Sequence, residues 1–192
     1  MTDAGTQGGA AGAPGVLLFD DFEDGDSVGW TESTTGDWSI VTDGSLVYRQ
    51  GTTSNTFRVA YAGDATWTDQ VVEAKVKVLG FVEGSTSNLV GVYARFKDIN
   101  NHYSVALRYD GKIAIRRRLN GSNNSITGGA TAGIVTDRWI SVKFEAIGST
   151  LNAYIDGALR ASVVDCSIPA GGVAVGTTNS TAEFDDIRVT LP

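Results

Sequence analysis

The sequence contains only one cysteine, three prolines and one histidine in 192 residues, and these scarcities exclude several classes of protein. A single cysteine, Cys166, cannot form a disulfide within the chain, and it supplies too few thiolates for a zinc site. We expect it to be a small buried apolar residue. No run approaches the roughly 18 apolar residues of a membrane span, and no charged-then-apolar leader is visible. We therefore expect no membrane partner.

Helical signals are absent as well, and short alternating runs take their place. No window shows a long helical period with capping residues. Glycine occurs 24 times, and clusters of Thr, Ser, Asn and Asp separate the runs. With 42% hydrophobic residues, the chain can bury one core. The sequence therefore predicts one all-β domain over residues 16–192, a two-sheet antiparallel sandwich with a polar loop at residues 120–133.

The first 15 residues differ in composition from the rest of the chain. Residues 1–15 consist mainly of Gly, Ala and Thr with a single Pro, which is typical of a flexible linker. We expect this segment to be the edge of a longer protein.

Basic residues are concentrated in one part of an acidic chain. The formal net charge is −7 and the pI is near 4.6, which argues against a nucleic-acid partner. Nine of the 15 basic residues nevertheless lie between positions 75 and 118. They are Lys75, Lys77, Arg95, Lys97, Arg108, Lys112, Arg116, Arg117 and Arg118. A basic face on an acidic protein suits an anionic ligand.

Three consecutive strands are predicted at residues 89–96, 102–109 and 112–119, because apolar and polar side chains alternate with period two. The pair Asp110–Gly111 predicts a type I′ turn with positive φ at both residues. The apolar face is predicted to carry Val90, Val92, Ala94, Phe96, Tyr103, Val105, Leu107, Tyr109, Ile113, Ile115 and Leu119. The opposite face carries Tyr93, Arg95, His102, Arg108, Arg116 and Arg118.

The arginine-lined face is the predicted ligand site. The planar fork of arginine matches carboxylates, and tyrosine rings would supply flat platforms for sugars. The predicted ligand-binding residues are Tyr93, Arg95, His102, Arg108, Arg116, Arg118, Lys75, Lys77 and Tyr154. The alternative is a sheet face made soluble by long charged side chains.

Two acidic motifs frame the domain, at residues 19–25 (FDDFEDG) and 184–189 (FDDIRV). Together with residues 100–107 (NNHYSVAL) and 119–121 (LNG), they resemble the laminin-G-like, concanavalin-A-like jelly-roll modules appended to bacterial pectate lyases and other secreted polysaccharidases. The resemblance covers about residues 16–192. It implies a jelly roll, a secreted bacterial protein and a parent catalytic domain. We also expect a monomer.

The same resemblance implies a structural calcium ion. The matching positions are Asp21, the turn Asp43–Gly44, and Asp185 or Asp186. Because the end strands of a jelly roll lie side by side, their carboxylates would repel one another without a cation, and calcium accepts such oxygen ligands in loose geometry. The alternative is a solvated acidic edge without an ion.

The function implied is that of a non-catalytic carbohydrate-binding module for an acidic polysaccharide, pectic or otherwise rich in uronate. Enzymes of this fold carry motifs that the chain lacks, such as a Glu-x-Asp-x-x-Glu strand. Two alternatives stay open. A small polysaccharide lyase would use Arg95 or Arg108 to neutralise the uronate and Tyr93 or His102 as the base. A protein-binding or adhesive laminin-G-like domain would use the same fold.

Overall fold

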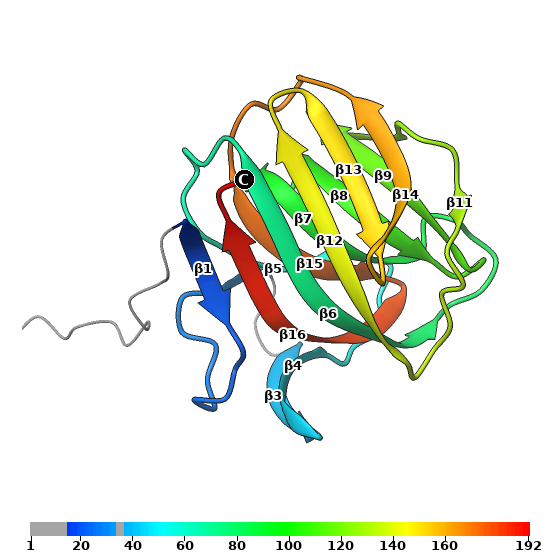
Figure 1. The fold of residues 1–192 in the computed structure, drawn as a ribbon. Helices are drawn as coiled ribbons and strands as arrows, with labels where there is room; N and C mark the ends of the chain where they lie inside the picture. Colours follow the sequence, from blue (N-terminus) through cyan, green and yellow to red (C-terminus); the bar gives the residue numbers. More distant parts are fainter. Residues whose placement is uncertain (1–14, 34–36) are drawn as a thin grey trace, which may run out of the picture.

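Two antiparallel sheets, each of eight strands, pack face to face in the computed structural model, which describes residues 15–33 and 37–192 (Figure 1). The predicted all-β sandwich is confirmed. Apart from Gly15, the predicted linker lies outside the described residues. Within the described ranges, no helix is long and apolar enough to cross a membrane.

Sheet A has the strand order β14-β13-β12-β6-β16-β4-β3, with β1 paired to β16. Its strands are β1 (Val16–Asp20), β3 (Trp38–Asp43), β4 (Ser45–Gln50), β6 (Gln70–Phe81), β12 (Trp139–Ile147), β13 (Thr150–Ile155), β14 (Ala158–Val164) and β16 (Ser180–Thr190). The first and last strands of the domain therefore lie side by side, as the jelly-roll resemblance implied.

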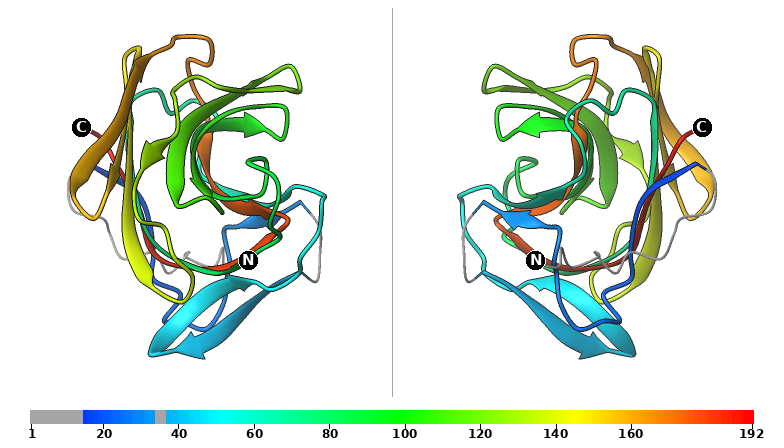
Figure 2. Two further views of the ribbon diagram at one scale, coloured as in Figure 1. Left: turned by 90° about the vertical axis from the view of Figure 1, so that its right-hand side faces the viewer. Right: turned by 90° about the vertical axis from the view of Figure 1, so that its left-hand side faces the viewer.

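Sheet B has the order β10-β9-β8-β7-β15-β5-β2, with β11 paired to β9. Its strands are β2 (Thr31–Glu32), β5 (Arg58–Ala62), β7 (Leu89–Asp98), β8 (Asn101–Arg108), β9 (Lys112–Leu119), β10 (Ser122–Ser125), β11 (Ala130–Thr131) and β15 (Gly172–Thr178). Figure 2 shows this sheet curling, with its hollow face turned away from sheet A.

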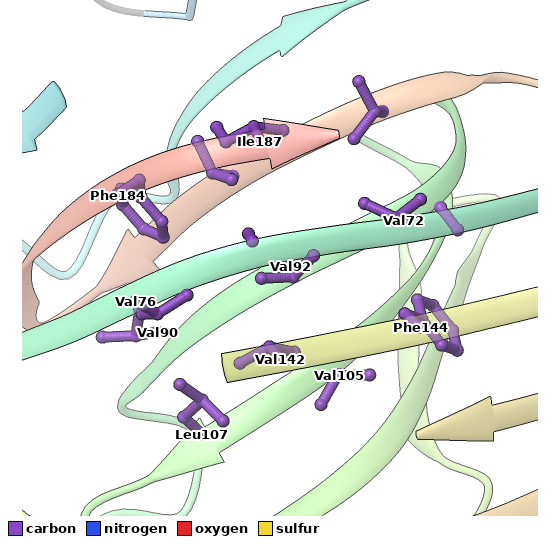
Figure 3. Close-up of a cluster of buried hydrophobic side chains, with 14 of the residues drawn as sticks. Val72, Val76, Val90, Val92, Val105, Leu107, Val142, Phe144, Phe184 and Ile187 are labelled. Carbon is purple, nitrogen blue, oxygen red and sulfur yellow. The ribbon is translucent and has the colours of Figure 1, made fainter. Parts of the chain in front are cut away.

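The core fills the space between the sheets with β-branched and aromatic side chains, which suit pleated surfaces (Figure 3). Sheet A contributes Val72, Val76, Val142, Phe144, Phe184 and Ile187, and sheet B contributes Val90, Val92, Val105 and Leu107. All of these side chains are buried. The inward faces predicted from period-two alternation are therefore confirmed for most positions of these strands.

The turn between β8 and β9 differs from the predicted type I′ geometry. Of the pair Asp110–Gly111, only Gly111 has a positive φ (74°), and its N–H donates to the Arg108 carbonyl over 3.1 Å. This is the three-residue hairpin loop that ends in a left-handed glycine. Positive φ at both turn residues occurs instead at Asp156–Gly157 (49° and 78°) and at Asn120–Gly121 (50° and 82°).

The segment predicted as a polar loop, residues 120–133, contains two short strands. The tight turn at Asn120–Gly121 reverses the chain directly, so that Ser122 pairs with Leu119 and β10 extends sheet B. β11 then pairs with the start of β9 through Ala130 and Ile113.

A β-bulge at Arg95 changes which side chains face the core. Phe96 pairs with Gly172 and Ala94 pairs with Val173, so Arg95 is an extra residue on β7, with φ at 47°. Alternation therefore shifts by one residue after Ala94. Phe96 packs with Tyr93 on the hollow face, and the prediction that placed Phe96 in the core and Arg95 on the open face is wrong.

Cys166 is exposed and not buried as expected. The residues on both sides of it are held by polar contacts with sheet B. Asp165 accepts hydrogen bonds from the Tyr103 hydroxyl and from Arg117, and Arg117 also donates to Ser167 over 2.9 Å. These contacts fix the loop by its polar side chains and leave the thiol at the surface.

Candidate ligand-binding site

The hollow face of sheet B contains a cavity of about 430 Å³. Its lining includes Phe57, Tyr93, His102, Ser104, Arg116 and Arg118. None of the described residues that line it is an aspartate or a glutamate. The cavity therefore combines two cationic side chains, aromatic rings and hydroxyl groups without a neutralising carboxylate.

Cross-strand register explains why these residues meet. Arg116 on β9 pairs with Ser104 on β8, Ser104 with Tyr93 on β7, Tyr93 with Ala174 on β15, and Ala174 with Tyr61 on β5. Directly paired residues project from the same face of a sheet. We call these five residues the Arg116 row. Arg118 and His102, also paired, stand one row further along the strands.

A glycine makes room for Tyr93 in the floor of the cavity. A Cβ atom at Gly91 would lie 2.6 Å from the Tyr93 ring, so the ring occupies the space that any side chain there would need. Gly176 pairs with Gly91 on the neighbouring strand β15. Gly91 therefore allows the tyrosine to lie over the sheet, whereas a Cβ atom at Gly176 would meet the Arg58 carbonyl and the Phe57 ring.

His102 is enclosed by aromatic rings. Its ring centroid lies 5.1 Å from Tyr93, 5.4 Å from Phe96 and 5.5 Å from Phe57. Nδ1 donates to the carbonyl oxygen of Asp98 over 3.1 Å, because a carbonyl can only accept. Burial lowers the pKa of His102 to about 4, and the nearby Arg118 adds to this shift. The imidazole is therefore neutral near pH 7 and contributes no charge to the cavity.

The two arginines of the cavity have no acidic partner among the described residues. The Nε and Nη1 atoms of Arg116 are buried and have no hydrogen-bond partner in the part of the chain that the structure describes, and burial lowers the pKa of its guanidinium. The Nε atom of Arg118 donates only to the Gly121 carbonyl, over 3.2 Å. Because a buried cation without a partner is destabilising, an anion in this cavity would gain an interaction that none of the described residues supplies.

Arg95 does not belong to the cavity. The bulge turns its side chain toward the edge of the core, where it is only 2% exposed. Its guanidinium donates to the carbonyls of Thr68, Ile168, Ala146 and Gly148 over 2.8–3.2 Å. These contacts join segments next to both sheets, so the structure gives Arg95 a structural role.

Arg108 faces the hollow side of sheet B but lies outside the residues that line the cavity. It forms an ion pair with Asp110, with Nη2 and Oδ2 2.7 Å apart. Its charge is therefore already balanced within the turn that follows β8.

Lys75, Lys77 and Tyr154 lie on the other sheet, contrary to the expectation that they join the arginines. Their strands, β6 and β13, belong to sheet A. Lys75 pairs with Asp186 over 2.6 Å, and Lys77 pairs with Asp43 and Glu183. The Tyr154 hydroxyl donates to Glu145 over 2.9 Å. The structure thus separates these three residues from the cavity by the thickness of the sandwich.

The residues predicted to bind calcium are neighbours in the fold but do not form one donor set. Asp20, next to Asp21, pairs with Ile187. Ser45, which follows the positive-φ turn at Gly44, donates to Asp185 over 3.1 Å. Asp43 and Asp186, however, are already paired with lysines. Among the described residues, no group of three or more His, Cys, Asp or Glu is arranged to hold a metal ion. Because calcium also accepts backbone carbonyls as ligands, binding by the remaining residues of the predicted set stays a prediction.

Calcium stays a prediction that now rests mainly on Asp21 and Asp185, the carboxylates of the predicted set that form no ion pair among the described residues. An ion bound only by the folded state would add about 2.7 kcal/mol at a hundredfold excess over Kd. We expect chelation to lower the melting temperature by several degrees and Asp185→Asn to abolish that response. An equal melting temperature with chelator and with millimolar calcium would contradict the prediction of a calcium site.

Sequence reasoning missed several residues of the cavity. Ser104 follows His102 by two positions and could have been placed by alternation alone. Asn123 could have been placed only after the Asn120–Gly121 turn was identified as a hairpin. Ser33 and Phe57 come from segments beside β2 and β5, and no periodic signal in the sequence points to them.

Comparisons with known proteins place the fold and leave the family open. No family model and no curated protein sequence matches the chain. Among solved structures, the carbohydrate-binding module CBM66 from Bacillus subtilis is similar, with a TM-score of 0.69 and 20% identity over 84% of this chain and 95% of that module. The Bacillus licheniformis β-glucanase has a TM-score of 0.69 and 14% identity, and covers 94% of this chain and 100% of the enzyme.

A third similar structure is the carbohydrate recognition domain of Emp47p, with a TM-score of 0.66 and 10% identity over 95% of this chain and 99% of that domain. At these identities the likeness shows the fold alone, a jelly-roll sandwich of the concanavalin-like type. The expected links to laminin-G domains and to pectate lyases stay predictions.

Proposed function

We propose that the domain is a non-catalytic carbohydrate-binding module that holds a uronate-containing polysaccharide in the cavity of sheet B. One observation carries the proposal, namely that Arg116 and Arg118 line a cavity that has no carboxylate among its described residues. Guanidinium groups bind carboxylates through charge-assisted hydrogen bonds. Tyr93 and His102 would contact the sugar ring beside the carboxylate.

The same lining gives little support to catalysis. A retaining or inverting glycosidase needs two carboxyl groups beside the scissile bond, and the described lining provides none. A lyase base would need a lowered pKa, whereas burial raises the pKa of Tyr93. Neither Arg95 nor Arg108, the two arginines predicted to neutralise a uronate, lines the cavity. The resemblance in sequence further suggests secretion and attachment to a catalytic domain, which we retain as part of the proposal.

Affinity electrophoresis against polygalacturonate, its fully methyl-esterified form and a neutral glucan tests the proposal. The ester is the matched ligand, because it keeps the sugar backbone and removes the charge. We expect retardation by polygalacturonate that weakens as salt is raised, with little or none by the other two polymers. Equal retardation by the charged and esterified polymers would contradict the proposal.

A companion assay addresses the lyase alternative. Incubation with polygalacturonate and alginate should give no increase in the absorbance of unsaturated uronate over hours. A steady increase that Tyr93→Phe or His102→Gln abolished would make the domain a lyase.

A further inference from the structure

Tyr61 presents an aromatic ring on the hollow face of sheet B, beyond the cavity. The residue is 37% exposed and is not among the residues that line the cavity. Its ring stacks on Phe96, with centroids 5.2 Å apart and an interplanar angle of 27°. Phe96 stacks in turn on His102, with centroids 5.4 Å apart. A continuous series of rings therefore leads from the cavity to the exposed ring of Tyr61.

The register of sheet B places Tyr61 in line with the arginines. It stands at one end of the Arg116 row, four strands away from Arg116. Neighbouring strands are about 4.8 Å apart, so the two residues are separated by about 19 Å along the sheet. Between Tyr93 and Tyr61 the row contributes only Ala174, which is buried in an apolar cluster with Val59 and Phe96, so a ligand that reaches Tyr61 passes over this cluster.

A lone exposed apolar residue is ordinary on a protein surface and indicates nothing by itself. Tyr61 differs because Phe96 covers one face of its ring and fixes its orientation. A ring held in this way loses little side-chain entropy when a ligand packs on its free side. Sugar rings present a face of C–H groups, which suits such contact.

We propose that the ligand is an oligosaccharide that runs across the strands of sheet B, with one uronate carboxylate at Arg116 and Arg118 and a later sugar ring packed on Tyr61. This inference rests on the proposed function, since it extends the same site. A single sugar occupies the cavity only, whereas a longer chain reaches the tyrosine. Affinity should therefore depend on chain length, and Tyr61 should carry part of that dependence.

Calorimetric titration with galacturonic acid oligomers, from the monomer to the hexamer, tests this arrangement. Tyr61→Ala should weaken binding of the hexamer by about tenfold, the scale of one aromatic contact, and leave binding of the monomer unchanged. Tyr61→Trp, with a larger ring and no loss of packing on Phe96, should bind the hexamer at least as well as the wild type. Tyr154→Ala, on the outer face of sheet A, is the matched control and should bind all lengths normally.

The outcomes separate this inference from the proposed function. If Tyr61→Ala binds the hexamer like the wild type while Arg116→Gln does not, the cavity binds uronate and the path toward Tyr61 is wrong. If Tyr61→Ala weakens the monomer and the hexamer equally, Tyr61 acts on the cavity and not on a further sugar, which also overturns the inference. If the wild type binds no oligomer, the proposed function itself fails.

Discussion

Arg95→Met is expected to lower the free energy of unfolding by about 3–5 kcal/mol, because it leaves several buried carbonyls and the Asp69 carboxylate without their donor. The carbonyls of Thr68, Ile168, Ala146 and Gly148 all accept from this one guanidinium. For a domain of this size the melting temperature should fall by about 10 °C. Thermal unfolding followed by circular dichroism measures the change.

Arg95→Lys separates the contribution of the positive charge from that of the arrangement of the guanidinium donors. Lysine keeps the positive charge but cannot direct donors toward several carbonyls at once, so we expect most of the destabilisation to remain. Arg160→Met is the control, because Arg160 is exposed on the edge strand β14, and it should change stability by no more than about 0.5 kcal/mol. A melting temperature for Arg95→Met within about 2 °C of the wild type would show that the guanidinium contacts contribute little.

The double variant Arg116→Gln/Arg118→Gln is expected to weaken binding of polygalacturonate by at least about 100-fold. Each charge-assisted hydrogen bond to a carboxylate is worth about 1.5–3 kcal/mol, and two are lost. The same variant should melt no lower than the wild type, because Arg116 has buried nitrogens without partners among the described residues. Loss of binding without loss of stability is the pattern expected of a ligand site.

Arg138→Gln/Arg160→Gln is the matched control for this experiment. It removes the same amount of charge from residues that do not line the cavity, so any general effect of net charge on attraction of an anionic polymer appears there as well. If both double variants lost affinity equally, the arginines of the cavity would have no special role. If the cavity variant instead unfolded, its arginines would be structural.

The fold could be predicted from the sequence wherever period-two alternation was uninterrupted. The strands β6, β8 and β12 follow that pattern, and their inward valines and aromatic residues lie in the core as expected. The prediction of which side chains face the core fails where the local backbone departs from regular strand geometry. No sequence pattern predicts that Arg95 takes a positive φ. The bulge at this residue exchanges the inward and outward positions of the side chains that follow it on β7. The Asn120–Gly121 pair, in contrast, is a hairpin signal that the sequence does carry, and it forms the turn between β9 and β10.

The site could be predicted only in part, because alternation places side chains within neighbouring strands but does not show how distant strands pair. Tyr93, His102, Arg116 and Arg118 were placed together by alternation on three consecutive strands, and they do line one cavity. The basic or aromatic character of Lys75, Lys77 and Tyr154 suggests the same site, but which sheet a strand joins depends on long-range pairing that no local pattern encodes. The Arg116 row extends to Tyr61 through β15 and β5, and this register is set by strands distant in sequence.

A thermodynamic cycle tests most directly whether Arg116 recognises the negative charge of the ligand. Calorimetry would measure the affinity of the wild type and of Arg116→Gln for a galacturonic acid hexamer and for its methyl ester. We expect the wild type to prefer the free acid by at least about tenfold and Arg116→Gln to lose most of that preference, a coupling of about 1–3 kcal/mol. An unchanged preference in Arg116→Gln would contradict the claim.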